Sequence, residues 1–197
     1  ALTALTTLGY EEPTPIQRES IPPVMAGRDL LGQAATGTGK TAAFALPVLN
    51  RLSKLTPPAG PRKPRALVLV PTRELAVQVA DSFKTYGRHL KLNVTTLFGG
   101  VGMQPQVEQL RRGVDVLVAC PGRLIDHLDR GSVKLDAVEV LILDEADRML
   151  DMGFLPAIKR VLNRLPKARQ TLLFSATFED RIKALALEFM RNPQQVQ

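Results

Sequence analysis

The sequence has little cysteine and no long apolar run. Cys120 is the single cysteine among 197 residues. One cysteine excludes an internal disulfide and a multi-cysteine metal site, as is typical of proteins in a reducing cytoplasm. No apolar stretch approaches the roughly 18 residues that span a bilayer. The first residues also lack the basic start and apolar core of a signal peptide. We therefore expect a cytoplasmic chain that makes no membrane contact.

The acidic residues are fewer than the basic ones. Twenty-six Lys and Arg residues against 19 Asp and Glu give a net charge of +7. An excess of this sign favours polyanionic partners such as nucleic acid, although a solvated basic surface is a common alternative explanation for an excess of this size. A hydrophobic content of 45% and this length fit one α/β domain with a substantial core.

A loop of small residues stands between a strand-like segment, 29–33, and a stretch of good helix formers. The loop spans 34–41 and reads Ala-Ala-Thr-Gly-Thr-Gly-Lys-Thr. Its glycines let successive N–H groups point at an anion, and the following helix adds its N-terminal donors. Lys40 would then contact the outer phosphates, and the Thr41 hydroxyl could bind Mg²⁺. The loop thus predicts a phosphate site, although Ala34 replaces the usual first glycine, and a simple turn that starts a helix is the alternative.

A capped helix start precedes this loop. Thr14 suits the cap, Pro15 fits the first turn, and Gln17 can reach back to the cap, which predicts a helix to about Met25. The proline-rich segment 56–64, after the phosphate-loop helix, is interpreted as a surface loop.

Short apolar runs alternate with helix-like stretches along the rest of the chain. The runs lie at 66–70, 94–98, 114–118, 138–143 and 170–174, and the helix-like stretches at 74–86, 104–112, 124–129, 157–165 and 180–190. Continuous apolar strands are typical of a parallel sheet that is covered on both faces. Ligands of such sheets bind at the carboxyl ends of the strands.

Three carboxylates follow the run at 138–143, in the sequence Asp144-Glu145-Ala146-Asp147. Beside a phosphate loop, the first carboxylate could hold Mg²⁺ through water, and the second could orient or deprotonate the attacking water. The alternative is an ordinary acidic helix start, which the helix dipole favours.

These four residues spell the name of the DEAD-box RNA helicases, and the chain resembles the amino-terminal RecA-like domain of that family in the order of its motifs. The segment from Gly9 to Gln17 resembles the adenine-reading Q motif, and 34–41 resembles motif I, with its alanine included. The resemblance implies a three-layer α/β RecA-like P-loop NTPase fold with a mostly parallel central sheet. It also implies ATP and Mg²⁺ as cofactors.

The resemblance assigns roles residue by residue. The catalytic residues would be Lys40, Asp144 and Glu145, with Thr41 and Asp144 at the metal. The nucleotide-binding set would be Tyr10, Thr14, Gln17, Ala35, Thr36, Gly37, Thr38, Gly39, Lys40 and Thr41. The RNA-binding set would be Pro71, Thr72, Arg73, Gly99, Gly100, Pro121, Gly122 and Arg123. Asp147, Ser175, Ala176 and Thr177 would couple hydrolysis to domain movement.

The chemistry of the side chains agrees with these roles, although purely structural explanations are also available. The Gln17 amide can donate to and accept from an adenine edge while it also closes a capping box. Arg73 and Arg123 could contact RNA phosphates with little sequence preference, or be ordinary surface charges. Asp147 could share hydrogen bonds with the hydroxyls of Ser175 and Thr177, or Ser175 could simply cap a helix.

The sequence departs from the family pattern in two places. Cys120 stands where a threonine is usual, which puts a hydroxyl contact to RNA in doubt. The family usually carries an aromatic residue well upstream of the Q motif, and the 197 residues begin too late to include that position, so we expect weaker affinity for the base. Tyr10 is a weak substitute that is expected instead to pack against the capped helix.

We expect a single domain, with a Q-motif region at 1–28 and a core at 29–197. The second RecA-like domain of these helicases, which would be the main protein partner, has no counterpart in the 197 residues. Two rival hypotheses remain at this point. One is a nucleic-acid-stimulated motor that acts on DNA, and the other is a binding module without useful turnover.

Overall fold

A seven-stranded parallel sheet forms the centre of the computed structural model, which describes residues 12–54 and 61–197. The strand order is β3-β4-β2-β5-β6-β1-β7, and every neighbouring pair is parallel. The strands are β1 (Leu30–Gln33), β2 (Ala66–Leu69), β3 (Val94–Leu97), β4 (Val116–Ala119), β5 (Val140–Leu143), β6 (Gln170–Ser175) and β7 (Gln194–Val196). The predicted parallel sheet is therefore confirmed.

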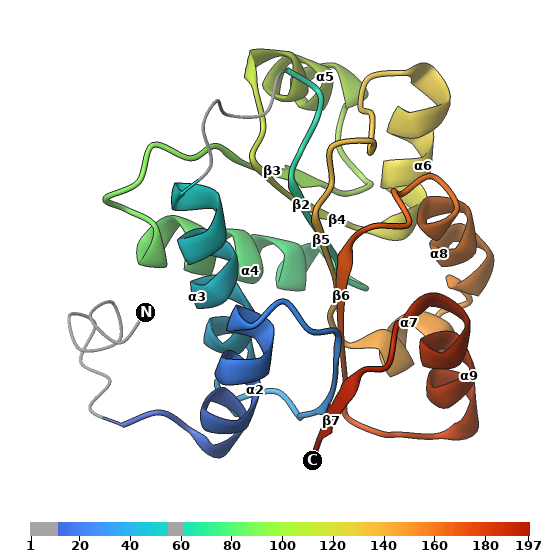
Figure 1. Cartoon of the computed structure of the whole chain (residues 1–197). Coiled ribbons are helices and arrows are strands. Elements are labelled where there is room, and N and C mark those ends of the chain that lie inside the picture. Colours follow the sequence, from blue (N-terminus) through green and yellow to red (C-terminus); the bar gives the residue numbers. More distant parts are fainter. Residues whose placement is uncertain (1–11, 55–60) are drawn as a thin grey trace.

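Helices cover both faces of this sheet (Figure 1). They are α2 (Pro15–Met25), α3 (Lys40–Ser53), α4 (Arg73–Tyr86), α5 (Met103–Arg112), α6 (Pro121–Arg130), α7 (Ala146–Asp151), α8 (Leu155–Leu162) and α9 (Asp180–Phe189). In Figure 1, α2, α3 and α4 lie on one side of the strands, and α6, α7, α8 and α9 lie on the other. The α/β molecule thus has three layers.

Neighbouring residues of one strand belong to different cores. Leu30 packs in a cluster with Phe44 of α3 and Val79 of α4, whereas Leu31 packs in a cluster with Ile158 of α8 and Ile182 of α9. Side chains alternate between the two faces of a strand. Both faces are apolar here, so the run of strand residues is continuously hydrophobic.

Two elements, α7 and β7, were not expected from the sequence. Only Val196 of β7 is apolar and buried. The strand forms because Gln194 N donates a hydrogen bond to Asp29 O at 2.9 Å and because Gln194 pairs with Leu30 of β1. Helix α7 has 6 residues, too few for a helical period to stand out. Among the helices of the described ranges, none has the length and apolar character needed to cross a bilayer.

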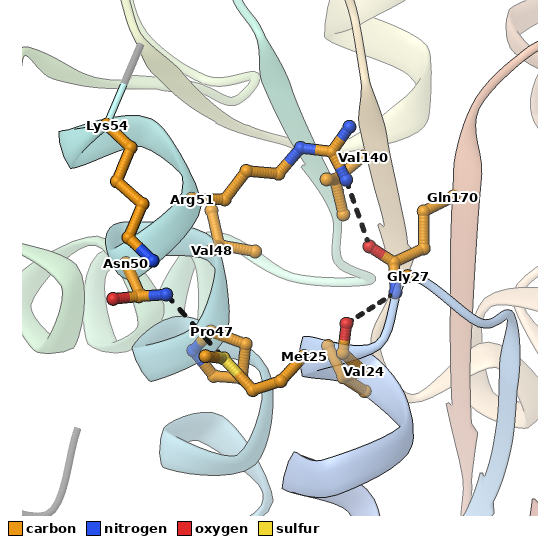
Figure 2. Close-up of a pocket in the computed structure, with 10 residues that line it drawn as sticks. All are labelled: Val24, Met25, Gly27, Pro47, Val48, Asn50, Arg51, Lys54, Val140 and Gln170. Carbon is orange, nitrogen blue, oxygen red and sulfur yellow. Dashed lines mark hydrogen bonds between the residues drawn. The ribbon is translucent and has the colours of Figure 1, made fainter.

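Gln170, at the start of β6, joins α2, α3 and the segment that leads into β1. Its amide Nε2 donates to Val24 O at 3.0 Å and to Arg28 O at 2.7 Å, while its Oε1 accepts from Arg51 at 3.4 Å. Figure 2 shows these side chains around a hollow of about 290 Å³ between α2, α3 and the first residues of β5 and β6. This hollow lies at the opposite edge of the sheet from the predicted site residues, and it contains none of them.

Candidate functional site

The predicted site residues gather at the carboxyl edge of the sheet, and the strand order divides them into two groups. The phosphate loop follows β1, the acidic tetrad follows β5, and Ser175 ends β6, so the nucleotide and coupling residues share neighbouring strands. The predicted RNA-binding residues follow β2, β3 and β4, on the other half of the same edge. Parallel strands thus bring segments from the whole chain to one edge.

The phosphate loop is shaped by glycines and leads directly into α3. Gly37 and Gly39 have φ angles of +85° and +83°, a region that favours glycine. The Thr38 hydroxyl donates to Ala35 O at 2.7 Å, which closes the loop. Ala35, Thr36 and Gly37 are exposed. The amides of the loop and of the start of α3 are therefore placed where an anion could approach them.

Gln17 joins the loop to the amino-terminal helix. Its Oε1 accepts from Thr14 N at 3.0 Å, and the Thr14 hydroxyl accepts from Gln17 N at 3.4 Å, which confirms the capping box. Its Nε2 donates to Gly39 O at 3.1 Å. A Cβ at Gly39 would lie 2.5 Å from Gln17 Nε2 and 3.0 Å from Thr14 Oγ1. Position 39 therefore requires glycine for space as well as for backbone conformation. The predicted contribution of Tyr10 lies outside the described residues.

We expect Gly39→Ala to destabilise the protein by about 1 kcal/mol more than Gly37→Ala. Both substitutions force a side chain into a left-handed conformation, but a Cβ at Gly37 meets no atom within 4 Å. Only the Gly39 variant must also push Gln17 and Thr14 away. Denaturant unfolding of the two variants measures the difference. Equal losses of unfolding free energy would contradict the steric contact of position 39 with Gln17 and Thr14.

Lys40 forms a buried ionic cluster with two of the three carboxylates. Its Nζ lies 2.9 Å from Asp144 Oδ1 and 3.6 Å from Glu145 Oε2. Asp144 is completely buried, and neither of its carboxylate oxygens makes a hydrogen bond of ordinary geometry with the described residues. Burial raises the pKa of the Asp144 carboxyl above its usual range, while the Lys40 ammonium opposes this rise. The cluster thus holds a buried carboxylate with unused acceptor capacity.

Glu145 has a left-handed backbone, with φ 53° and ψ 52°, at the N-cap of α7. This conformation is uncommon for a residue with a side chain, and such residues concentrate at functional sites. Its carboxylate also lies 3.6 Å from Arg148 Nη1. The turn directs Glu145 toward Lys40, beside the end of β5.

The side chains around Lys40 fit a magnesium ion that is also bound by phosphates. Mg²⁺ in nucleotide sites takes one or two carboxylates together with phosphate oxygens and waters. Asp144 offers a buried carboxylate whose ionic partner is Lys40, and Thr41 carries a hydroxyl in the first turn of α3. No group of three or more His, Cys, Asp or Glu side chains within 12–54 and 61–197 could form a metal cage by itself.

The predicted coupling residues lie on neighbouring strand ends, but the expected hydrogen bonds of Asp147 with Ser175 and Thr177 are not formed in this structure. Ser175 Oγ accepts from Thr177 N at 3.4 Å, and Gln33 Nε2 donates to Ala176 O at 3.1 Å. No hydrogen bond of the described residues joins Asp147 to Ser175 or Thr177. The segment after β6 is thus tied to β1, the strand that carries the phosphate loop.

Thr72 and Arg73 begin α4 after β2 and Pro71. The Thr72 hydroxyl accepts from Leu75 N at 3.2 Å, and it keeps one hydrogen to donate. The exposed Arg73 guanidinium lies 4.9 Å from the centre of the Phe98 ring, a cation–π arrangement. This contact links the starts of two predicted RNA-binding segments.

Gly99 and Gly100 form an exposed turn after β3, and Pro121, Gly122 and Arg123 begin α6 after β4. The Arg123 side chain is 13% exposed and its Nη1 donates to Val101 O at 3.0 Å, so it is an internal link as much as a surface charge. This hydrogen bond of Arg123 and the residues that hold the guanidinium in place were not predicted from the sequence.

The Cys120 thiol precedes α6. Burial, with a smaller effect of Glu74, raises its pKa to about 11. The thiol is therefore protonated at neutral pH, and it makes a poor nucleophile.

An apolar hollow of about 290 Å³ adjoins the phosphate loop. Its lining residues are Thr14, Pro15, Ile16, Gln33, Ala34, Thr38 and Gln197. Thr14 and Thr38 connect it to the capped helix and to the phosphate loop. A flat apolar group attached to a phosphate chain could enter at this point.

Comparisons with known proteins agree with this geometry. Residues 14–185 match the family described as DEAD/DEAH box helicase. The chain is 48% identical over 196 residues to "ATP-dependent RNA helicase DeaD" from Klebsiella pneumoniae, covering 99% of this chain and 30% of that protein. It is also 48% identical to the protein of the same name from Mycobacterium tuberculosis, covering 99% of this chain and 34% of that one. The chain thus spans about a third of the length of these relatives.

Two solved structures are similar over nearly the whole chain. A DEAD box protein from the hyperthermophile Methanococcus jannaschii has a TM-score of 0.92 and 38% identity, covering 99% of this chain and 52% of that one. A hypothetical ATP-dependent RNA helicase from Sulfolobus tokodaii has a TM-score of 0.89 and 35% identity, covering 99% and 55%. The predicted RecA-like fold is confirmed by this likeness.

Proposed function

Because the chain belongs to the DEAD/DEAH box helicase family, we propose that it acts as the amino-terminal RecA-like domain of an ATP-dependent RNA helicase. In this proposal it binds magnesium-ATP at the phosphate loop and an RNA backbone along the β2, β3 and β4 half of the edge. The observation that carries the nucleotide part is the fully buried Asp144 carboxylate, which lies 2.9 Å from Lys40 Nζ directly beside the phosphate loop. The domain limits, a Q-motif region at 1–28 and a core at 29–197, and a cytoplasmic location belong to the same proposal.

Nucleotide binding requires Lys40 to exchange partners. Its Nζ, now 2.9 Å from Asp144, would turn to the outer phosphates. Asp144 would then hold a buried negative charge without an ionic partner, which is costly. Together with Thr41, Asp144 would hold Mg²⁺, which supplies charge neutralisation at the phosphates when bound. Phosphates and metal are thus expected to bind together.

Glu145 is proposed to position and deprotonate the attacking water. Its backbone turn directs the carboxylate into the cluster, one residue beyond the metal-holding Asp144. Hydrolysis and strand separation would also need the second RecA-like domain. That domain would supply arginines to the transferred phosphoryl group.

We expect the chain to prefer adenine nucleotides because of Gln17. Its Oε1 and Nε2 each make one internal hydrogen bond, so each keeps one further hydrogen-bonding position. Gln17 is buried in this structure, so a base edge would reach these positions only after the groups that cover the amide move aside. Replacing Gln17 with alanine should narrow the difference between ADP and GDP affinity, as measured by calorimetry. Thr14→Val also breaks the capping box but keeps the Gln17 amide, so it should lower the affinities for ADP and GDP by the same factor. Equal binding of ADP and GDP by the unmodified chain would reject adenine reading.

We expect weak, salt-sensitive binding of single-stranded RNA in which Arg73 contributes more than Arg123. Arg73 is exposed, whereas the Arg123 side chain is largely buried and bonded internally. Arg73→Gln should lower RNA affinity and reduce the slope of log affinity against log salt by about 0.7. Fluorescence anisotropy at several KCl concentrations measures both quantities.

The matched control for this measurement is Arg160→Gln on α8, where the arginine pairs with Asp129 at 3.0 Å. It should leave RNA binding unchanged. Tight, salt-insensitive binding to one sequence would instead indicate base readout. Preference for DNA of the same length would favour a DNA motor.

A further inference from the structure

Three buried polar side chains lie beneath the turn that follows β3. Gln106 of α5, His127 of α6 and Ser132, just beyond α6, are 6%, 0% and 8% exposed. None of them belongs to the predicted nucleotide, RNA or coupling sets. Burying polar groups is costly unless they are hydrogen-bonded, so the arrangement of the three needs a reason.

Their hydrogen bonds lead to both sides of the glycine turn. Gln106 Nε2 donates to Phe98 O at 3.0 Å, directly before Gly99. Arg123 Nη1 donates to Val101 O at 3.0 Å, directly after Gly100, and also to Gln106 Oε1 at 3.2 Å. The two carbonyls that bracket the glycines are therefore held by one connected set of side chains.

The turn has no side chains of its own with which to hold this shape. Gly100 has a φ of +80°, and a Cβ built at Gly99 or Gly100 would meet no atom within 4 Å. Glycine is the most flexible residue in the unfolded and folded chain. The conformation of the turn thus depends on the bonds to its flanking carbonyls.

The orientation of the Gln106 amide is determined by its neighbours. If the amide were reversed, its oxygen would face Phe98 O and its NH₂ would face the Arg123 guanidinium, which pairs like with like. Oxygen Oε1 therefore also faces His127 Nε2, at 2.8 Å. Since Oε1 only accepts, Nε2 of His127 must carry the hydrogen.

The other imidazole nitrogen is held by Ser132. Nδ1 lies 2.7 Å from Ser132 Oγ, which also lies 3.1 Å from His127 O. The hydroxyl has one hydrogen, and in a neutral Nε2–H ring that hydrogen goes to the bare Nδ1, the nearer of the two acceptors. Burial, followed by the positive charge of Arg123, lowers the pKa of His127 to about 4. Arg130 lowers it further, and Asp126 acts in the opposite direction. The neutral ring is thus the form present at neutral pH.

We propose that Ser132, His127 and Gln106 form a buried hydrogen-bonded relay that positions the Gly99–Gly100 turn and the Arg123 guanidinium for RNA. Ser132 fixes the imidazole, the imidazole N–H fixes the amide oxygen, and the amide fixes both Phe98 O and Arg123. The three are positioning residues, since none is exposed enough to touch RNA. The inference rests on the proposed function only in naming RNA as the ligand of the positioned turn.

The test compares His127→Leu, which removes the donor, with His127→Gln, which restores an N–H near the position of Nε2. Leu128→Ala, on the same helix, is the matched control, because Leu128 is a buried apolar residue whose truncation lowers stability without removing a polar contact. We expect His127→Leu to lower affinity for single-stranded RNA about tenfold, the effect of one lost hydrogen bond. It should also speed amide exchange at 99–101 and leave ADP affinity unchanged. His127→Gln should recover RNA affinity to within about threefold of the unmodified chain, and Leu128→Ala should change neither RNA affinity nor exchange in the turn.

A spectroscopic measurement tests the relay without RNA. The chain has two histidines, and His89→Gln leaves His127 alone in the ¹⁵N spectrum of the ring. A protonated Nε2 and a bare Nδ1 at neutral pH are expected, and the opposite tautomer would overturn the relay. Unchanged RNA affinity and turn exchange in His127→Leu would also overturn it. If the unmodified chain binds no RNA, the proposed function fails, while turn exchange and the ring spectrum still decide whether the relay holds the turn.

Discussion

Replacing Lys40 with alanine is expected to lower the affinity for magnesium-ATP at least about 100-fold, whereas Glu145→Gln should leave that affinity nearly unchanged. Lys40 is the cation of the phosphate loop, and charge-assisted bonds to phosphate are among the strongest polar contacts. Glu145→Gln keeps the shape of the side chain and removes the base. Hydrolysis by the complete enzyme should therefore fall by a factor of about 10² or more. Calorimetry measures the two affinities, and equal losses would reject this division of roles.

The Lys40 variant needs a control for folding, because Lys40 is also the ion-pair partner of a fully buried carboxylate. Breaking a buried pair from one side costs on the order of 3–5 kcal/mol. Asp144 would avoid part of this cost by protonation, since burial already raises its pKa. The double variant Lys40→Ala with Asp144→Asn removes both charges. It should recover most of the stability without recovering nucleotide binding, which separates the two effects.

The second large effect concerns strand separation. We expect the 197 residues by themselves not to unwind an RNA duplex, even at saturating ATP and RNA. The predicted RNA-binding residues follow β2, β3 and β4 along one edge, so they offer a single surface. Bending a strand needs a second surface that closes over ATP, and closure would also bring arginines worth about 10³ or more in rate.

Adding a second RecA-like domain should restore RNA-stimulated hydrolysis and unwinding, and a covalent linker should restore them at lower concentration. A fluorescence strand-displacement assay measures the unwinding. Its control is the same mixture with Glu145→Gln. This variant should still bind RNA, but it should not separate strands over repeated cycles. Robust unwinding by the 197-residue chain alone would show that the two-domain mechanism does not apply.

The alternation of strands and helices could be predicted from the sequence because each buried parallel strand is a continuous apolar run. The runs at 66–70 and 138–143 became β2 and β5. Strand β7 could not be predicted, because Gln194 and Gln195 are polar and their pairing depends on Leu30 and Leu31, far away in the chain.

The candidate site could be predicted as far as its residues follow strand ends. Lys40, Asp144 and Glu145 come together because β1 and β5 both flank β6. The hydrogen bonds between side chains were beyond sequence reasoning. Asp147 does not bond Ser175 as expected, and the polar contacts of Arg123 with Val101 O and Gln106 depend on how α5 and α6 pack.

The position of β1 within the sheet determines when this strand can pair during synthesis on the ribosome. Its two neighbours are β6 and β7, which begin at Gln170 and Gln194. At ordinary rates of synthesis, β6 leaves the ribosome on the order of ten seconds after β1. Strands β2, β3 and β4 have all of their partners before β6 is made, and β5 already has β2, so these four strands can assemble during this interval. The strand that carries the phosphate loop is thus the last to be paired on both sides. Its apolar residues Leu30 and Leu31 become buried only after most of the domain has been synthesised.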